Sequence, residues 1–144
     1  MRFEDVDAAQ LVFFANYFDY CHEAMEGLLS PQQGGYTELI MDRKIGLAME
    51  SVEAEFHSPL RFGQHVRITA SVDKIDKSSC TFRYVFTCLD RKSKHAEPTE
   101  TEPVGVIRHG VNFIDLRTML PVEIPKDVLL VLESHSVPGS KTAA

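Results

Sequence analysis

The chain has 144 residues, with 15 Lys and Arg against 21 Asp and Glu and a formal net charge of −6. A chain of this size buries roughly 70% of its unfolded surface, enough for one core, and 44% apolar with 25% charged residues excludes disorder as the main state. No apolar run reaches the ~18–20 residues of a membrane span, residues 1–5 lack the apolar stretch expected of a signal peptide, and an acidic chain is a poor partner for nucleic acid. These exclusions leave a cytoplasmic enzyme or a small binding module.

The first predicted element is an amphipathic helix over residues 14–29. Its apolar residues follow the i, i+3, i+4, i+7 rhythm of one helical stripe, at Phe14, Tyr17, Phe18, Cys21, Met25, Leu28 and Leu29. The sequence Ser30-Pro31, followed by Gly34-Gly35, predicts the end of this helix.

Strands follow the helix. Apolar and polar residues alternate over 52–56, 66–72 and 80–88, while 104–114 is apolar at most positions and predicts a more buried strand. Short polar turns between such runs favour an antiparallel meander, with 91–103 as a solvated hairpin loop. Residues 120–125 are expected to be extended and 126–132 to form a closing helix. One helix against four or five strands is an α+β architecture, so we expect a single domain over 1–135 and a flexible tail over 136–144.

The cysteines and the two histidines around the 58–64 turn do not have the spacing of a metal site. Cys21, Cys80 and Cys88 are an odd number with no CxxC pair, which favours buried reduced thiols over disulfides or a zinc ribbon. His57 and His65 flank a turn without a carboxylate or cysteine at ligand spacing.

The segment before the helix is the strongest candidate for chemistry. Asp5 and Asp7 precede the expected first turn, where a helix N-terminus presents unsatisfied N–H groups and about half a positive charge. Such a terminus can hold the oxygen of a polarised carbonyl while a nearby carboxylate attacks it or activates water. Either aspartate is equally suited to forming a turn through its side chain, so the residues alone leave both readings open.

Three motifs in register resemble one known family. Residues 5–17, with Asp-x-Asp followed by apolar and aromatic positions and Asn16-Tyr17, resemble the signature of the 4-hydroxybenzoyl-CoA-thioesterase-like acyl-CoA thioesterases. Residues 52–64 resemble that family's second strand and its Pro-Leu-x-x-Gly turn, and residues 75–82 its basic-Ser-Ser turn. The resemblance covers residues 3 to about 125. It implies the hotdog fold, in which one long central helix packs against a curved antiparallel sheet of about five strands.

The resemblance also implies an activity, which is hydrolysis of an acyl-CoA thioester to a free acid and coenzyme A. Asp7 matches the family's catalytic carboxylate, as nucleophile or general base, and Phe14 matches the position whose backbone N–H binds the thioester oxygen. Glu23, on the helix, is the second-choice carboxylate. No metal or redox cofactor is implied, and proteins of this kind form homodimers or homotetramers with sites at the subunit interface.

Other positions are assigned to substrate binding. Lys77, Ser78 and Ser79 match a turn that contacts coenzyme A phosphates in some members of the family, and Arg61 is a further candidate for the same anion.

Phe13 and Tyr36 are candidates for the acyl pocket.

Gln10 stands where the family usually has Gly, so the loop around Asp7 is expected to approach the substrate differently. The short stretch before Asp7 indicates either a natural start further upstream or a different pairing of that sheet edge. The acyl group itself is not identified.

Two alternatives stay open. One is a non-catalytic acyl-CoA-binding module, which the Gln10 departure favours. The other is an acyl-thioester dehydratase or hydratase, which pairs a histidine with a carboxylate near the helix; His22 lies far along the helix for that role. His109 and Asn112, in the last long strand, are expected to be structural.

Overall fold

The computed structural model describes residues 16–31, 34–61, 63–89 and 103–142. Its elements in chain order are α1 (Asn16–Leu29), α2 (Gly35–Met41), β1 (Ile45–Phe56), β2 (Val66–Ile75), β3 (Ser79–Cys88), β4 (Gly105–Asp115), α3 (Lys126–Ser134) and β5 (Ser136–Thr142). Within these ranges, no helix is long and apolar enough to cross a membrane.

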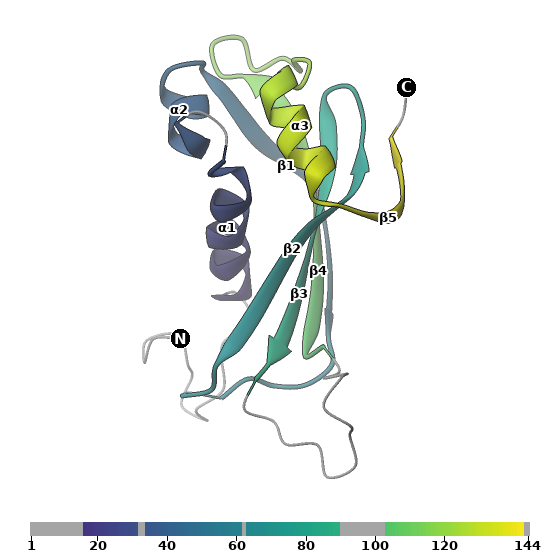
Figure 1. Ribbon diagram of the computed structural model, residues 1–144. Helices are drawn as coiled ribbons and strands as arrows, with labels where there is room; N and C mark the ends of the chain where they lie inside the picture. Colours follow the sequence, from purple (N-terminus) through teal and green to yellow (C-terminus); the bar gives the residue numbers. More distant parts are fainter. Residues whose placement is uncertain (1–15, 32–33, 62, 90–102, 143–144) are drawn as a thin grey trace.

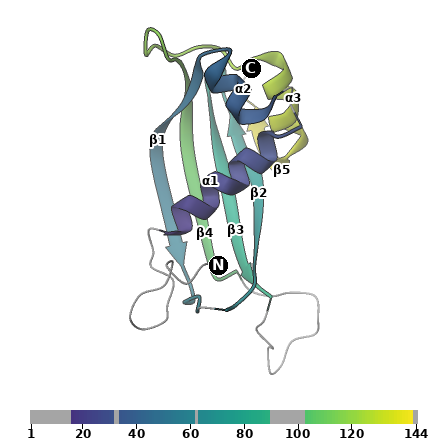
Figure 2. The same ribbon diagram turned by 90° about the vertical axis from the view of Figure 1, so that its left-hand side faces the viewer.

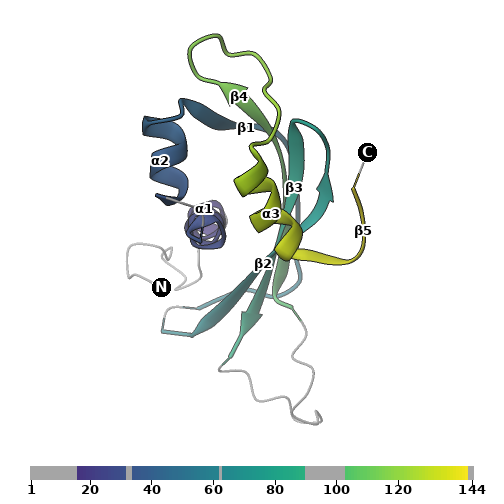
Figure 3. The same cartoon turned by 45° about the horizontal axis from the view of Figure 1, so that its top comes forward.

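Helix α1 is the central helix. It lies obliquely across one face of the sheet (Figure 2), and its buried residues are Tyr17, Cys21, Met25, Leu28 and Leu29. Viewed nearly end-on, it has α2 on one side and α3 on the other (Figure 3). The helix ends at Leu29 as the Ser-Pro sequence predicts, and Ser30 Oγ donates a hydrogen bond to the Gly27 carbonyl at 2.7 Å. These five residues all belong to the predicted stripe, whereas Phe18 is half-buried and Phe14 lies outside the described residues.

Four strands form an antiparallel sheet in the order β1-β4-β3-β2 (Figure 1). The register pairs Val66 with Cys88 and Ser79 with Asn112. Alternate residues of β3 are buried under the helices, namely Cys80, Phe82, Tyr84, Phe86 and Cys88. The three cysteines are reduced and buried, which confirms that prediction.

The structure differs from the sequence pattern in three places. The strands are not a simple meander, because β1 pairs with β4 and the segment 57–65 crosses the end of the sheet to reach β2. Residues 136–142, expected as a tail, form β5, which pairs with β2 in parallel because α3 turns the chain back before it. The short helix α2 was not predicted; it begins where Gly34 adopts a left-handed conformation with φ 75°. The predicted loop over 91–103 lies, except for Pro103, outside the described residues.

An ion cluster joins the two short helices. Arg43 donates from Nη1 and Nη2 to the two carboxylate oxygens of Asp127 at 2.9 and 2.7 Å, and from Nε to Glu38 at 3.0 Å. Glu38 belongs to α2 and Asp127 to the first turn of α3. The hydrogen bond from Arg43 lowers the pKa of Asp127 and raises that of Arg43 itself. The guanidinium therefore links Glu38 of α2 to the first turn of α3.

Candidate functional site

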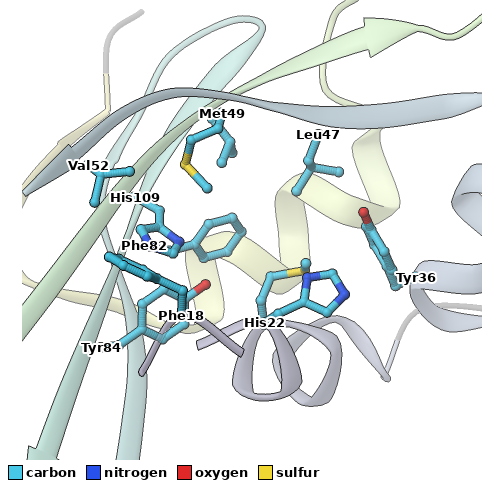
Figure 4. Close-up of a pocket in the computed structure, with 11 residues that line it drawn as sticks. Phe18, His22, Tyr36, Leu47, Met49, Val52, Phe82, Tyr84 and His109 are labelled. Atoms are coloured by element: carbon cyan, nitrogen blue, oxygen red, sulfur yellow. The ribbon is translucent and has the colours of Figure 1, made fainter. Parts of the chain in front are cut away.

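A pocket of about 350 Å³ lies between α1 and the sheet (Figure 4). Its lining is almost entirely apolar and aromatic. The lining residues belong to α1, α2, β1, β3 and β4, and they are Phe18, His22, Met25, Tyr36, Leu47, Met49, Val52, Phe82, Tyr84, His109 and Val111. Ligand sites are characteristically concave, mostly apolar and equipped with few polar groups. This pocket has those properties.

Strand β1 supplies one wall of the pocket through a β-bulge. The register shifts between Met49 and Ser51, so that Met49 opposes Val111 while Val52 opposes His109. In a regular strand, two residues three apart point to opposite faces. The extra residue at the bulge therefore turns both Met49 and Val52 toward the pocket, and bulges are frequent beside functional sites for this reason.

The floor of the pocket contains one buried polar side chain, His109 on β4. Its imidazole stacks on Phe18 with 5.8 Å between ring centroids and meets the edge of Tyr84 at 5.4 Å. Burial lowers the pKa of His109, which keeps the ring neutral at pH 7, and burial raises the pKa of Tyr84, which keeps the phenol protonated. Nε2 of His109 is buried without a hydrogen-bond partner among the described residues.

The rim of the pocket carries a histidine and a tyrosine. The His22 ring meets Tyr36 edge-on at 5.7 Å, and His22 Nε2 lies 2.9 Å from Glu26 Oε1 on the exposed side of α1. Burial raises the pKa of Tyr36, with a smaller contribution from Glu26. Tyr36, which the sequence analysis assigned to an acyl pocket, lines this pocket, and Glu23 is exposed on the helix.

The predicted catalytic residues Asp7 and Phe14, and the predicted pocket residues Phe13 and Gln10, lie outside the described residues. The described part of α1 begins at Asn16, two residues before Phe18 in the pocket wall. The pocket therefore extends along α1, from the turn nearest the predicted catalytic segment in the sequence to Met25.

The predicted coenzyme A contacts are far apart within one chain. Arg61 precedes β2 and is exposed, whereas Lys77, Ser78 and Ser79 form the turn after it. Ten residues of strand separate these ends by about 30 Å. Arg61 shares an end of the sheet with the start of α1, since Tyr17 contacts Phe56, the last residue of β1, with 5.0 Å between ring centroids.

The turn itself is held by backbone hydrogen bonds. The Asp76 amide donates to the Ser79 carbonyl at 2.8 Å, the Phe113 amide to the Ser78 carbonyl at 2.7 Å and the Ile124 amide to the Lys77 carbonyl at 2.9 Å. The Lys77 side chain is exposed. A single chain thus does not bring Arg61 and this turn to one anion.

Sequence reasoning missed most of the pocket lining. His109, expected to be structural, is buried and also borders the pocket; a polar residue in an otherwise apolar strand was the signal for it. Met49 and Leu47 gave no signal, because the bulge that orients Met49 leaves no mark in the alternation. In the part of the chain that the structure describes, no cluster of His, Cys, Asp or Glu is suited to a metal ion.

Comparison with known proteins identifies the class. Residues 1–132 match the thioesterase-like superfamily, and the chain belongs to that superfamily, as the motifs predicted. Among curated proteins, it is 25% identical over 125 residues to the acyl-CoA thioesterase YbgC of Helicobacter pylori, covering 86% of this chain and 89% of that one.

One further curated relative agrees with this membership, and a solved structure shows the fold. The chain is 24% identical over 135 residues to a 1,4-dihydroxy-2-naphthoyl-CoA hydrolase of Nostoc punctiforme, covering 94% of this chain and 84% of that one. Among solved structures, a gentisyl-coenzyme A thioesterase superposes with a TM-score of 0.74 at 24% identity, over 92% of this chain and 94% of that one. The fold is therefore the hotdog fold of these thioesterases.

Proposed function

We propose that the protein is an acyl-CoA thioesterase that hydrolyses an acyl-CoA thioester to the free acid and coenzyme A. The observation that carries this proposal is the apolar pocket between α1 and the sheet, which includes Phe18 in the first described turn of α1, in a chain of the thioesterase-like superfamily. The pocket holds the acyl group. The thioester carbonyl lies at the start of the helix, where N–H groups and the helix dipole favour a developing negative charge.

In this proposal Asp7 is the nucleophile or the general base, and the Phe14 amide donates to the oxyanion. Both roles of Asp7 need an ionised carboxylate in the same place. Arg61 lies at the end of the sheet where α1 begins, so it contacts the coenzyme A of its own chain. Lys77, Ser78 and Ser79 contact coenzyme A only across a subunit interface, since they lie at the other end of β2.

The proposed assembly is a homodimer or a homotetramer. The outer edge of β1 has no neighbouring strand among the described elements, and Met49, Val52 and Phe56 on this strand are 54, 47 and 46% exposed. A second copy that covers this edge would remove an aggregation-prone surface and close the pocket. Light scattering behind a sizing column tests this assembly directly.

The activity is tested by thiol release from a panel of aliphatic and aromatic acyl-CoAs. Asp7→Asn is expected to lower kcat by roughly 10²–10⁴-fold, the usual contribution of a positioned base. Asp5→Asn, two residues away, is the matched control and should stay within about threefold, a small effect on the scale of catalytic losses. Phe14→Leu should also retain activity, because the proposed donor is the backbone amide. Full activity of Asp7→Asn would refute the mechanism but not the function.

Two alternatives have distinct outcomes in the same experiment. An acyl-CoA-binding module would bind members of the panel without releasing any thiol. A dehydratase or hydratase is favoured by one observation, the His22–Glu26 pair at the pocket rim. It would add water to a short enoyl-CoA and lose that activity in His22→Gln, while releasing no thiol.

A further inference from the structure

Exposed apolar side chains gather along one edge of the molecule. Most of the large apolar residues that are exposed within the described ranges lie on β1 or beside its start, among them Met49, Val52 and Phe56 on the strand and Met41, Leu116 and Met119 beside its start. Apolar residues gathered in this way are typical of a surface that another molecule covers. The outer edge of β1 also has no neighbouring strand among the described elements.

The loop formed by residues 116–120 belongs to this surface. It follows β4 and projects at the end of the sheet where β1 starts (Figure 2). The Leu116 amide donates to the Lys44 carbonyl at 2.8 Å, and the Met119 amide donates to the Asp115 carbonyl at 2.6 Å. Met119 is 64% exposed and has a φ of 62°, a left-handed conformation that is uncommon for a bulky side chain and is found most often at functional sites.

The charges of β1 favour one way of pairing with a second copy. Glu53 and Glu55 lie near the end of the strand, Lys44 lies just before its start, and all three are exposed. Two identical edge strands related by a two-fold axis in one sheet pair antiparallel. Pairing about the middle of the strand places the two glutamates opposite Ala48 and Gly46 of the second copy and brings Glu55 close to its Lys44. Like charges are then kept apart and unlike charges meet.

This pairing brings the loop of one copy to the site of the other. The two ends of β1 are about 35 Å apart along the strand, so within one chain the 116–120 loop is remote from Phe56. Across the interface Phe56 lies opposite Ile45 of the second copy, and Ile45 pairs with Asp115, the residue before the loop. Phe56 packs against Tyr17 in the first turn of α1, with 5.0 Å between ring centroids. The loop of the second copy therefore comes beside the start of α1.

We propose that the 116–120 loop of one chain covers the mouth of the candidate site in its partner, and that Met119 of this loop contacts the acyl-CoA bound there. This inference rests on the proposed thioesterase function, which places the thioester at the start of α1. An apolar side chain at this point fits the uncharged arm of coenzyme A between its phosphates and the thioester. The 77–79 turn, which contacts coenzyme A only across an interface, lies at the same end of the sheet, because the Phe113 amide donates to the Ser78 carbonyl at 2.7 Å.

Cross-linking tests where the loop lies without relying on activity. Chains with Met119→Cys and chains with Phe56→Cys are co-expressed and treated with a short bismaleimide, while the native cysteines are buried. A covalent dimer with one chain of each kind is expected, and neither variant alone should give one. Leu130→Cys, which is equally exposed but lies on α3, replaces Met119→Cys in the control and should not cross-link. His57→Cys, at the adjacent exposed residue, takes the place of Phe56→Cys if that variant does not fold.

Kinetics test the contact with substrate. Met119→Asn removes the apolar side chain and suits the left-handed backbone, so it should raise KM for acyl-CoA by roughly fivefold to twentyfold with kcat unchanged, as the loss of a uniform binding contact does. Co-expression of Asp7→Asn with Met119→Asn then produces mixed dimers. If the loop acts across the interface, one site of each mixed dimer has neither change, and activity with the wild-type KM reappears. If it acts within its own chain, KM stays raised.

Three results would overturn the proposal. These are a monomeric protein in light scattering, a dimer in which Met119→Cys gives no cross-link to either position at the end of β1, and a Met119→Asn variant with unchanged KM. A wild type that releases no thiol from any acyl-CoA instead refutes the proposed function. The cross-link then still decides whether the loop lies against the partner, so the two failures are distinguishable.

Discussion

Breaking the ion cluster between the two short helices should cost measurable stability. Replacement of Arg43 by Met removes two hydrogen bonds to Asp127 and one to Glu38. Hydrogen bonds to charged groups contribute about 1.5–3 kcal/mol when buried, but the Asp127 side chain is 43% exposed and Arg43 27%, which lowers the value toward that of surface pairs. We expect a loss of about 1–2 kcal/mol in the free energy of unfolding, or roughly 3–8 °C in Tm.

The stability that Arg43→Met loses should become smaller at acidic pH. Hydrogen bonding to Arg43 lowers the pKa of Asp127 below its ordinary value of 3.8. A carboxyl whose folded pKa is lowered stabilises the protein above its unfolded pKa, and this stabilisation is lost as the pH falls through the folded value. The difference between wild type and Arg43→Met should therefore be constant from about pH 5 to pH 8 and shrink below about pH 4.

A double-mutant cycle measures the interaction free energy between Arg43 and Asp127. It uses urea unfolding of the wild type, Arg43→Met, Asp127→Asn and the double variant. A coupling of about 1 kcal/mol is expected. Arg117→Met, at an exposed arginine, is the control and should change stability by no more than about 0.5 kcal/mol. A coupling near zero, or an Arg43→Met loss that persists unchanged at pH 3, would refute the reasoning.

Three further outcomes are expected. Burial raises the pKa of Cys21 and Cys80 to about 12, and the Cys88 side chain is fully buried, so a thiol reagent at pH 8 should label none of the three cysteines before unfolding and all of them after it. Gly110→Ala would bring a Cβ within 2.3 Å of Ser51 Oγ; thermal melts should reveal destabilisation of about 1–3 kcal/mol, partly restored by adding Ser51→Ala. Leu29→Ala, at a fully buried position, should cost about 2–5 kcal/mol in urea unfolding, and a smaller loss would mean that the core rearranges to fill the space.

The sequence predicted local elements well where one physical rule dominates. Helix α1 follows from its apolar stripe and its Ser30-Pro31 end, and β3 from strict alternation over Cys80 to Cys88. The antiparallel pairing of β2 with β3 follows from the short connection over residues 76–78. In each case the pattern of nearby residues determines the element, and tertiary contacts stabilise the same element.

Elements whose position depends on distant parts of the chain were not predicted. The pairing of β1 with β4 depends on the route of segment 57–65, in which Leu60 is fully buried. The seven residues of α2 are too few for a periodic pattern, and the helix depends on the left-handed Gly34. The motif before α1 located the candidate site at one end of the helix, whereas the pocket lining was unpredictable because it gathers residues from five elements.

The pocket has two sides that differ in how strongly they contribute to the core. Phe82 and Tyr84 in its floor are each 1% exposed and belong to the core, whereas Met49 and Val52 in the β1 wall are about half exposed in a single chain. Substitutions in the wall consequently change the shape of the pocket at little cost in folding stability, while substitutions in the floor affect both. A library directed at Met49 and Val52 is therefore the economical route to variants with altered acyl preference.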